Sequence, residues 1–325
     1  MLAKRLSGGA VVTLAALFSL CAGSTAGAID KVRIDYATYN PVSLLLKEQG
    51  LLEKEFAADK IAVDWTMSAG SNKALEGLEK NIIDFGSSAG AAAFMSRAGG
   101  LAIKSIYVFS RPEWTALVVP EKSPLRSVSD LKGKKIAVTK GTDPHIFLLR
   151  ALEDAGLTDK DVTLVPLQHA DGRRAMEAGE VDAWAGLDPM MAQAELLSNA
   201  RLMFRDPYLN TYGVLNVRED FLAQNGDIIT RVLKVYESAR QAAIQNPDAL
   251  KAVLIKVAKI DDAVAARQLE RTDLRKSAIG NAQQRTIKAA GDVLQRVGVV
   301  AKDVNVEKTV NSLIDPQFAA KFSAN

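Results

Sequence analysis

The stretch KIAVTKGTDPHIFLLRALEDAG, residues 135–156, contains the pattern that decides the fold. Residues 135–139 are rich in apolar and β-branched side chains, which predicts a strand. Residues 141–144, Gly-Thr-Asp-Pro, predict a loop and a helix start, because a capping side chain followed by Pro commonly opens a helix. Residues 146–155 predict a helix that ends at Gly156.

The same strand, loop and helix occur earlier in the chain. Residues 32–36 predict a strand, residues 38–41 a polar loop and residues 42–56 a helix with one interruption. Each loop places Asn or Asp directly before Pro, and Pro41 and Pro144 are 103 residues apart. This spacing indicates an internal repeat.

A second set of elements repeats at nearly the same spacing. A short helix, a strand and a further helix are predicted in each half, at 75–80, 82–85 and 91–97 and then at 175–178, 181–185 and 190–198. Asp84 and Asp182 occupy corresponding places. The repeat predicts two similar α/β domains, with a chance match as the alternative because strand–turn–helix units are common.

Two β-rich runs mark where the chain passes between these domains. Residues 115–119 leave the first domain and residues 212–217 return to it, and after Glu219 the sequence predicts a tail of helices packed on the first domain. The expected organisation is a signal peptide at 1–28, lobe I at 29–114 plus 214–325, and lobe II at 115–213.

The first 28 residues have the features of a secretory signal peptide. Lys4 and Arg5 precede the uncharged stretch 9–22, and residues 26–28, Ala-Gly-Ala, match the cleavage pattern. The apolar stretch falls short of the about 20 residues that a membrane-spanning helix needs. Cys21 follows Leu, whereas lipid attachment prefers a small residue there. The sequence therefore predicts an exported, soluble protein.

Composition excludes several classes of protein. The 325 residues are 48% hydrophobic and 24% charged, which is typical of a globular chain. The net charge of +3 falls to +1 without residues 1–28, so nothing favours a nucleic acid or a lipid surface as partner. One cysteine and two histidines exclude a disulfide scaffold and a cysteine-rich metal site. We expect no cofactor and no metal.

Four strand-to-helix loops are candidates for ligand binding: residues 38–40, 86–89, 139–143 and 186–188. In α/β domains ligands lie at the carboxyl ends of strands, against helix N-termini whose free N–H groups suit a compact oxyanion. Loop hydroxyl groups add donors. For each side chain taken alone, capping of the helix is the better explanation, and Asp143 and Asp188, which precede Pro, are expected to be caps.

Aromatic and titratable side chains add further candidates. Trp114 and Tyr212 lie at the expected crossovers, where the floor of a cleft would be. Glu113 is either a pocket carboxylate that accepts from a ligand ammonium or an exposed loop carboxylate. His145 and His169 have no cysteine or evident acid–base partner, and phosphate-loop, GxGxxG and HExxH motifs are missing from the sequence.

Several segments resemble periplasmic substrate-binding proteins of the aliphatic sulfonate, taurine and nitrate ABC importers. These segments are KEQGLLEK at 47–54, DFGSS at 84–88, SPLRSVSDLKGKKIAVTKGT at 123–142 and VDAWAGLDP at 181–189. The resemblance covers about residues 32–220. It implies the two-lobed, type II periplasmic binding protein fold, in which each α/β lobe is a mixed sheet flanked by helices and two strands cross between the lobes.

The resemblance also implies a function without catalysis. A ligand would bind between the lobes, and the closed protein would deliver it to a membrane permease. Together with Glu113, the residues expected to bind the ligand are Thr38, Tyr39, Asn40, Ser87, Ser88, Ala89, Trp114, Gly141, Thr142, Asp188 and Tyr212.

Three pocket positions depart from the family pattern. Leu187 replaces a frequent Trp, residues 37–40 read Ala-Thr-Tyr-Asn in place of a Gln-Lys loop, and residues 113–114 replace a Gly-Ser pair. An aliphatic sulfonate is the first choice of ligand. Taurine, nitrate or another small amine- or carboxylate-bearing solute, and an enzyme on the same fold, are alternatives. We expect a periplasmic monomer whose partners are a small organic anion and an ABC transporter permease.

Overall fold

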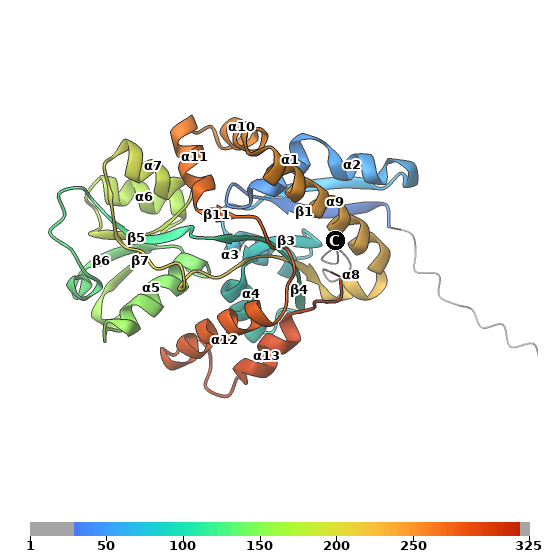
Figure 1. Cartoon of the computed structure of the whole chain (residues 1–325). Helices are drawn as coiled ribbons and strands as arrows, with labels where there is room; N and C mark the ends of the chain where they lie inside the picture. The colour runs from blue at the N-terminus through green and yellow to red at the C-terminus, as the bar shows by residue number, and fades with distance from the viewer. Residues whose placement is uncertain (1–28, 319–325) are drawn as a thin grey trace, which may run out of the picture.

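The computed structural model describes residues 29–318, so the predicted signal peptide lies outside the described residues. Two sheets flanked by helices form two lobes (Figure 1). The six-stranded sheet has the order β11-β4-β10-β3-β1-β2, and the five-stranded sheet has the order β7-β6-β8-β5-β9. The strands are β1 (Lys31–Tyr36), β2 (Ala62–Met67), β3 (Phe85–Ala89), β4 (Ile103–Pro112), β5 (Thr115–Val119), β6 (Lys135–Val138), β7 (Thr163–Pro166), β8 (Ala183–Leu187), β9 (Arg201–Phe204), β10 (Gly213–Arg218) and β11 (Thr272–Asp273).

Both sheets contain the same strand arrangement, which confirms the predicted repeat. β1 pairs in parallel with β2 and β3, and β10 runs antiparallel to β3. β6 pairs in parallel with β7 and β8, and β5 runs antiparallel to β8. The two corresponding acids make the same contact: Oδ2 of Asp84 accepts from the N–H of Arg33 in β1 at 3.0 Å, and Oδ2 of Asp182 accepts from the N–H of Lys135 in β6 at 2.8 Å.

The helices cover both faces of the sheets (Figure 1). They are α1 (Pro41–Glu48), α2 (Leu51–Phe56), α3 (Ser71–Glu79), α4 (Gly90–Ala98), α5 (Asp143–Asp154), α6 (His169–Glu177), α7 (Met190–Leu197), α8 (Glu219–Gln224), α9 (Gly226–Gln245), α10 (Pro247–Ala258), α11 (Asp262–Glu270), α12 (Asn281–Arg296) and α13 (Val306–Leu313).

The two helix starts that follow β1 and β6 differ in their caps. Asn40 caps α1 as predicted, since its side chain accepts from the N–H of Ser43 at 3.4 Å. The prediction that Asp143 caps α5 is wrong. Thr142 has the extended backbone of a capping position and Asp143 is already the first helical residue, so its carboxylate points to other partners.

The predicted helical tail is present, but it contacts both lobes and not the first alone. α9 and α10 pack on α1, and α12 packs on α4, as expected. α11 also packs on α7, and α12 on α5 (Figure 1). Leu44 of α1, Ala192 of α7 and Val264 of α11 belong to one buried cluster. The tail therefore joins the two lobes.

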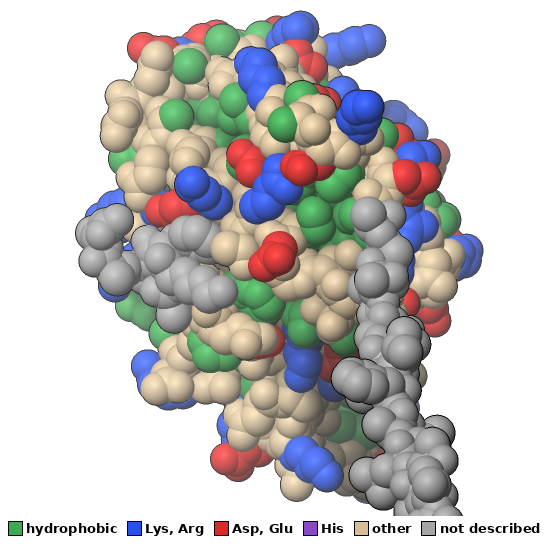
Figure 2. Space-filling view, turned by 90° about the vertical axis from the view of Figure 1, so that its right-hand side faces the viewer, with side chains coloured by type: hydrophobic (Ala, Val, Ile, Leu, Met, Phe, Trp, Pro, Cys, Tyr) green, Lys and Arg blue, Asp and Glu red, His purple; other side chains and the backbone are tan. Residues whose placement is uncertain are grey.

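The surface of the six-stranded lobe carries mixed charges. Figure 2 shows Lys and Arg interspersed with Asp and Glu over this face. This distribution agrees with the small net charge and gives that face no extended area of one sign. Within residues 29–318, no helix has both the length and the hydropathy needed to cross a membrane.

Candidate functional site

Loops that follow parallel strands of the two sheets meet between the lobes. The position that a Cβ would take at Gly141, after β6, lies 3.5 Å from Cβ of Asn72 in α3 and 3.8 Å from Cε of Met95 in α4. The corresponding position at Gly70, before α3, lies 3.0 Å from Nε2 of His169 at the start of α6. The strand ends of both lobes therefore face each other, and we call this region the interlobe contact.

Two predicted ligand residues, Asn40 and Ser87, belong to a buried network inside the first lobe. Nδ2 of Asn40 donates to Oγ of Ser87 at 2.8 Å and to the hydroxyl of Tyr236 at 2.9 Å. The N–H and the hydroxyl of Ser87 both donate to Oδ1 of Asp35, at 2.8 and 2.9 Å. Burial raises the pKa of Asp35 to about 6, while the hydrogen bonds from Ser87 lower it. This network fixes the end of β3 against the loop after β1.

The other predicted residues of β3 are also bonded within the lobe. Oγ of Ser88 accepts from Nδ2 of Asn216 at 2.8 Å, and the N–H of Ala89 donates to Oγ of Ser71 at 3.0 Å. Ser71 is the first residue of α3, so this bond sets the position of that helix relative to β3.

Thr38 and Thr142 occupy the loops after β1 and β6. Thr142 is buried, and its hydroxyl donates to the carbonyl oxygen of Thr139 at 2.6 Å. Thr38 is half-buried, and its carbonyl oxygen accepts from Nε2 of Gln268 in α11 at 2.6 Å. The tail helix α11 thus contacts one of the predicted loops directly.

Tyr39 and Trp114 stack edge to face at the crossover between the lobes. Their ring centroids are 5.8 Å apart at an interplanar angle of 83°. Nε1 of Trp114 donates to Oδ2 of Asp143 at 2.8 Å, and Asp143 also accepts from the N–H and the hydroxyl of Thr211. Burial raises the pKa of Asp143, and these hydrogen bonds oppose the rise. Trp114 is 3% exposed, so its ring packs in the core and its N–H joins the two crossovers.

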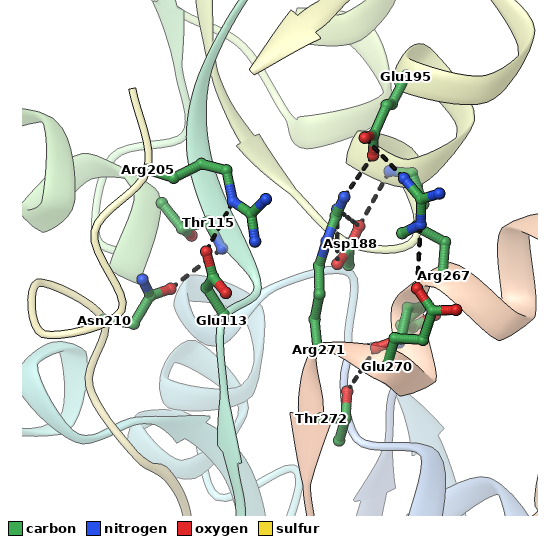
Figure 3. Close-up of polar contacts among 12 residues, drawn as sticks. Glu113, Thr115, Asp188, Glu195, Arg205, Asn210, Arg267, Glu270, Arg271 and Thr272 are labelled. Carbon is green, nitrogen blue, oxygen red and sulfur yellow. Dashed lines mark hydrogen bonds and ion pairs between the residues drawn. The ribbon is translucent and has the colours of Figure 1, made fainter. Parts of the chain in front are cut away.

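Asp188 takes part in an ion-pair network between α11 and α7, shown in Figure 3. Its Oδ1 accepts from the N–H of Ala192 in the first turn of α7 at 2.9 Å, as a capping side chain would, although Pro189 and not Asp188 holds the N-cap position. Nη1 of Arg271 lies 3.4 Å from both carboxylate oxygens, and Arg271 also pairs with Glu195. Arg267 pairs with Glu195 at 2.7 Å. Burial raises the pKa of Asp188 to about 7, although Arg271 lowers it.

Glu113 and Tyr212 have partners other than the residues that define the interlobe contact. Nε of Arg205 donates to Oε1 of Glu113 at 2.7 Å (Figure 3). The guanidinium of Arg111 lies 6.0 Å from the ring centroid of Tyr212. Tyr212 lines a groove of about 1070 Å³ together with parts of α9 and residues 275–283. Gly70 and His169 are not among the described residues that line this groove.

Three buried polar atoms belong to residues outside the twelve predicted ligand residues. Oδ1 of Asn72, Nε2 of His169 and Oε1 of Gln268 are buried, and none of them has a hydrogen-bond partner in the part of the chain that the structure describes. Burial lowers the pKa of His169 to about 3, so its ring is neutral. Among residues 29–318, no group of three or more His, Cys, Asp or Glu could hold a metal ion.

Asn72 and His169 lie in the first turns of α3 and α6, which follow β2 and β7, and Gln268 lies in α11. β2 is exposed along much of its length and β7 has four residues that end in Pro166, so neither has a strong strand pattern in the sequence. Recognition of both strands would have pointed to the loops after them.

Two similar α/β lobes, two crossovers and strand-end loops that meet between the lobes define the class of two-lobed binding proteins.

The chain belongs to the NMT1/THI5 like family, whose model matches residues 54–250. It is 32% identical over 243 residues to a putative aliphatic sulfonates-binding protein of Escherichia coli (strain K12), which covers 74% of this chain and 76% of that protein. The alkanesulfonate-binding protein SsuA from Xanthomonas axonopodis pv. citri, solved with MOPS bound, is 28% identical with a TM-score of 0.79, over 86% of this chain and 97% of that one. The desulfurization enzyme DSZB, at 14% identity and a TM-score of 0.64 over 90% of this chain and 98% of that one, shares the fold alone.

Proposed function

We propose that this chain is the solute-binding component of an ABC importer in the periplasm. In this proposal it binds a small organic anion, first of all an aliphatic sulfonate, between its lobes and delivers it to a membrane permease. It acts without catalysis and as a monomer. Residues 1–28 direct export, and residues 29–114 plus 214–325 and residues 115–213 are the two lobes.

This proposal is supported above all by two helix N-termini that lie close together at the interlobe contact. α3 begins after Gly70 and α6 begins at His169, and these two residues come from different lobes and lie against each other. The first N–H groups of a helix have no intrahelical partner and carry a partial positive charge, which favours an anion. The names of the relatives described above support a sulfonate as that anion.

The mechanism follows from the position of the site. An anion between the lobes interacts with donors from both sides only when the lobes are closed, so its binding energy favours the closed arrangement. The buried network around Asn40 and Ser87 holds the strand ends of lobe I rigid. The pair Trp114 and Asp143 fixes the crossover about which the lobes would move.

A thermal-shift panel on ligand-stripped protein tests the proposal. The panel contains ethanesulfonate, butanesulfonate, taurine, nitrate, sulfate and acetate at the same ionic strength. We expect the alkanesulfonates to raise the unfolding temperature, because a ligand at 100 times its Kd stabilises the folded state by about 2.7 kcal/mol. Stabilisation by nitrate or acetate alone would identify that anion, and not a sulfonate, as the ligand. A panel without any stabilising anion would refute the proposal.

A further inference from the structure

The groove beside Tyr212 is built from fixed elements and is large. Its volume of about 1070 Å³ exceeds what a short alkanesulfonate would fill and suits a larger ligand. Residues of α9 and the segment 275–283, which leads into α12, line it. The N–H of Val108 in β4 donates to the carbonyl oxygen of Ser277 at 2.9 Å, so this segment is tied to the six-stranded sheet.

The lining of the groove has an excess of positive charge. Its charged residues are Arg111, Arg240, Arg275, Lys276, Glu237 and Asp273. Both acids already have a cationic partner: Nε of Arg240 donates to Oε2 of Glu237 at 2.8 Å, and Arg275 pairs with Asp273 at 2.8 Å. Arg111 and Lys276 are exposed, and neither forms an ion pair within residues 29–318. The charges of these two side chains therefore remain available to an anion.

The start of α12 adds neutral donors to the same groove. Gly280 holds the N-cap position and has no side chain that could accept from the first N–H groups of the helix. Oε1 of Gln283 accepts from the N–H of Gly280 at 2.9 Å, and Nε2 of Gln283 has no acceptor in the part of the chain that the structure describes. Gln283 is 5% exposed and lines the groove. The helix N-terminus and this amide both favour a negatively charged ligand.

We propose that this groove is a second binding site, separate from the interlobe contact, for a polyvalent anion that carries phosphate or carboxylate groups. A single charge would gain little from exposed cations, whereas an anion with several charges can engage Arg111, Lys276 and the start of α12 together. Gly70 and His169 do not line the groove among the described residues. The inference does not depend on the proposed function.

Isothermal titration calorimetry at pH 7.5 and low ionic strength tests the site with pyrophosphate and citrate, and with acetate as the monovalent reference. We expect pyrophosphate, citrate or both to bind at least about tenfold more tightly than acetate. The tighter of the two identifies phosphate or carboxylate as the preferred group. Binding should weaken as salt is added, because Arg111 and Lys276 are exposed. Each titration is repeated with excess ethanesulfonate, which should leave the affinity unchanged.

Two substitutions and a control locate the site. Arg111→Gln and Lys276→Gln should each weaken binding about tenfold, the effect of one lost charge-assisted contact. Lys160→Gln makes the same change in net charge at an exposed lysine that is not among the described lining residues, and it should leave the affinity unchanged.

Gly280→Asp separates binding from stability. A Cβ at Gly280 would have no heavy atom within 4 Å, so the groove has room for the side chain. The new carboxylate should cap α12 and raise the unfolding temperature, while it repels the anion and weakens binding by more than about tenfold. Weaker binding in this variant would therefore not result from a damaged fold.

The outcomes distinguish this inference from the proposed function. Binding of pyrophosphate and citrate no tighter than that of acetate would overturn the inference, as would unchanged affinity in the Arg111 and Lys276 variants. Equal weakening in Lys160→Gln would indicate attraction to net charge alone and would also overturn it. Displacement by ethanesulfonate would refute a separate site. A lack of ethanesulfonate binding would count against the proposed function alone.

Discussion

Arg271→Met tests the ion-pair network between α11 and α7. The Arg271 side chain is 5% exposed and pairs with Asp188 and Glu195. Removal of one partner of a buried pair usually costs about 3–5 kcal/mol, because a buried charge is left alone. Here the pKa of Asp188 is already raised to about 7, so without Arg271 the carboxyl binds a proton at pH 7 at little cost. The loss should therefore be smaller, about 2 kcal/mol, which corresponds to charge-assisted hydrogen bonds.

The pH dependence of this loss is the sharper part of the prediction. The folded-state pKa of Asp188 lies above its usual value, so its protonated form stabilises the folded state at low pH and this contribution disappears as pH rises through about 7. Loss of Arg271 raises that pKa further. Between pH 7 and pH 8.5 the variant should therefore lose about 1.5 kcal/mol more than the unmodified protein, at 1.36 kcal/mol per pH unit.

Urea denaturation at constant ionic strength, followed by circular dichroism, measures both quantities. Arg275→Met is the matched control, because the Arg275 side chain is 81% exposed and its pair with Asp273 should contribute at most about 1 kcal/mol. A difference between the Arg271 variant and the unmodified protein that is the same at both pH values would refute the reasoning. A control that costs as much as Arg271→Met would refute the role of burial.

Three further predictions concern the site. His169→Phe should make the fold less sensitive to acid. Because the pKa of His169 is lowered to about 3, the unmodified protein loses stability as pH falls below about 6.5, by about 2 kcal/mol at pH 5. Urea unfolding at pH 7 and pH 5 should show a smaller loss of unfolding free energy in the variant. A loss of equal size in both proteins would contradict this. Asn40→Ala should lower the unfolding free energy by about 2–3 kcal/mol, because Ser87 and Tyr236 lose a buried partner and α1 loses its cap. A cost below about 0.5 kcal/mol in the same assay would contradict the network, because ordinary surface substitutions cost that little. Gly70→Ala should weaken sulfonate binding by about tenfold in calorimetry, since the added Cβ would lie 3.0 Å from Nε2 of His169 and oppose the contact between the lobes; unchanged affinity would contradict this role of the contact.

The sequence predicted the repeated core of the fold because that core depends on local patterns. The strand at 135–139, the interrupted helix at 42–56 and the crossover at 115–119 appear as β6, α1 with α2, and β5. At the interruption, Gly50 has a φ of +59°, a backbone conformation that Gly adopts readily. Asp84 and Asp182 were matched from sequence alone, and in the structure each accepts from a backbone N–H of the strand that opens its repeat, β1 or β6.

The site was harder to predict because its contacts join distant parts of the chain. Nothing local indicates that the amide of Asn40 bonds to Tyr236, or that Arg271 in the tail pairs with Asp188. A polar residue in a loop has the same sequence pattern whether its side chain faces a ligand or bonds to another loop. The ligand role of the twelve predicted residues therefore stays a prediction, and the structure adds Asn72 and His169 as candidates.

Hydrogen exchange with and without ethanesulfonate tests most directly whether an anion binds between the lobes. The account predicts slower exchange in two separate peptides, one that spans Gly70–Lys73 and one that spans Gln168–Gly172, because they belong to the two lobes and meet at the interlobe contact. Exchange in residues 275–283 should not change, since they line the groove beside Tyr212, and neither Gly70 nor His169 is among the described residues that line it. Protection limited to one lobe, or found only at residues 275–283, would contradict binding between the lobes.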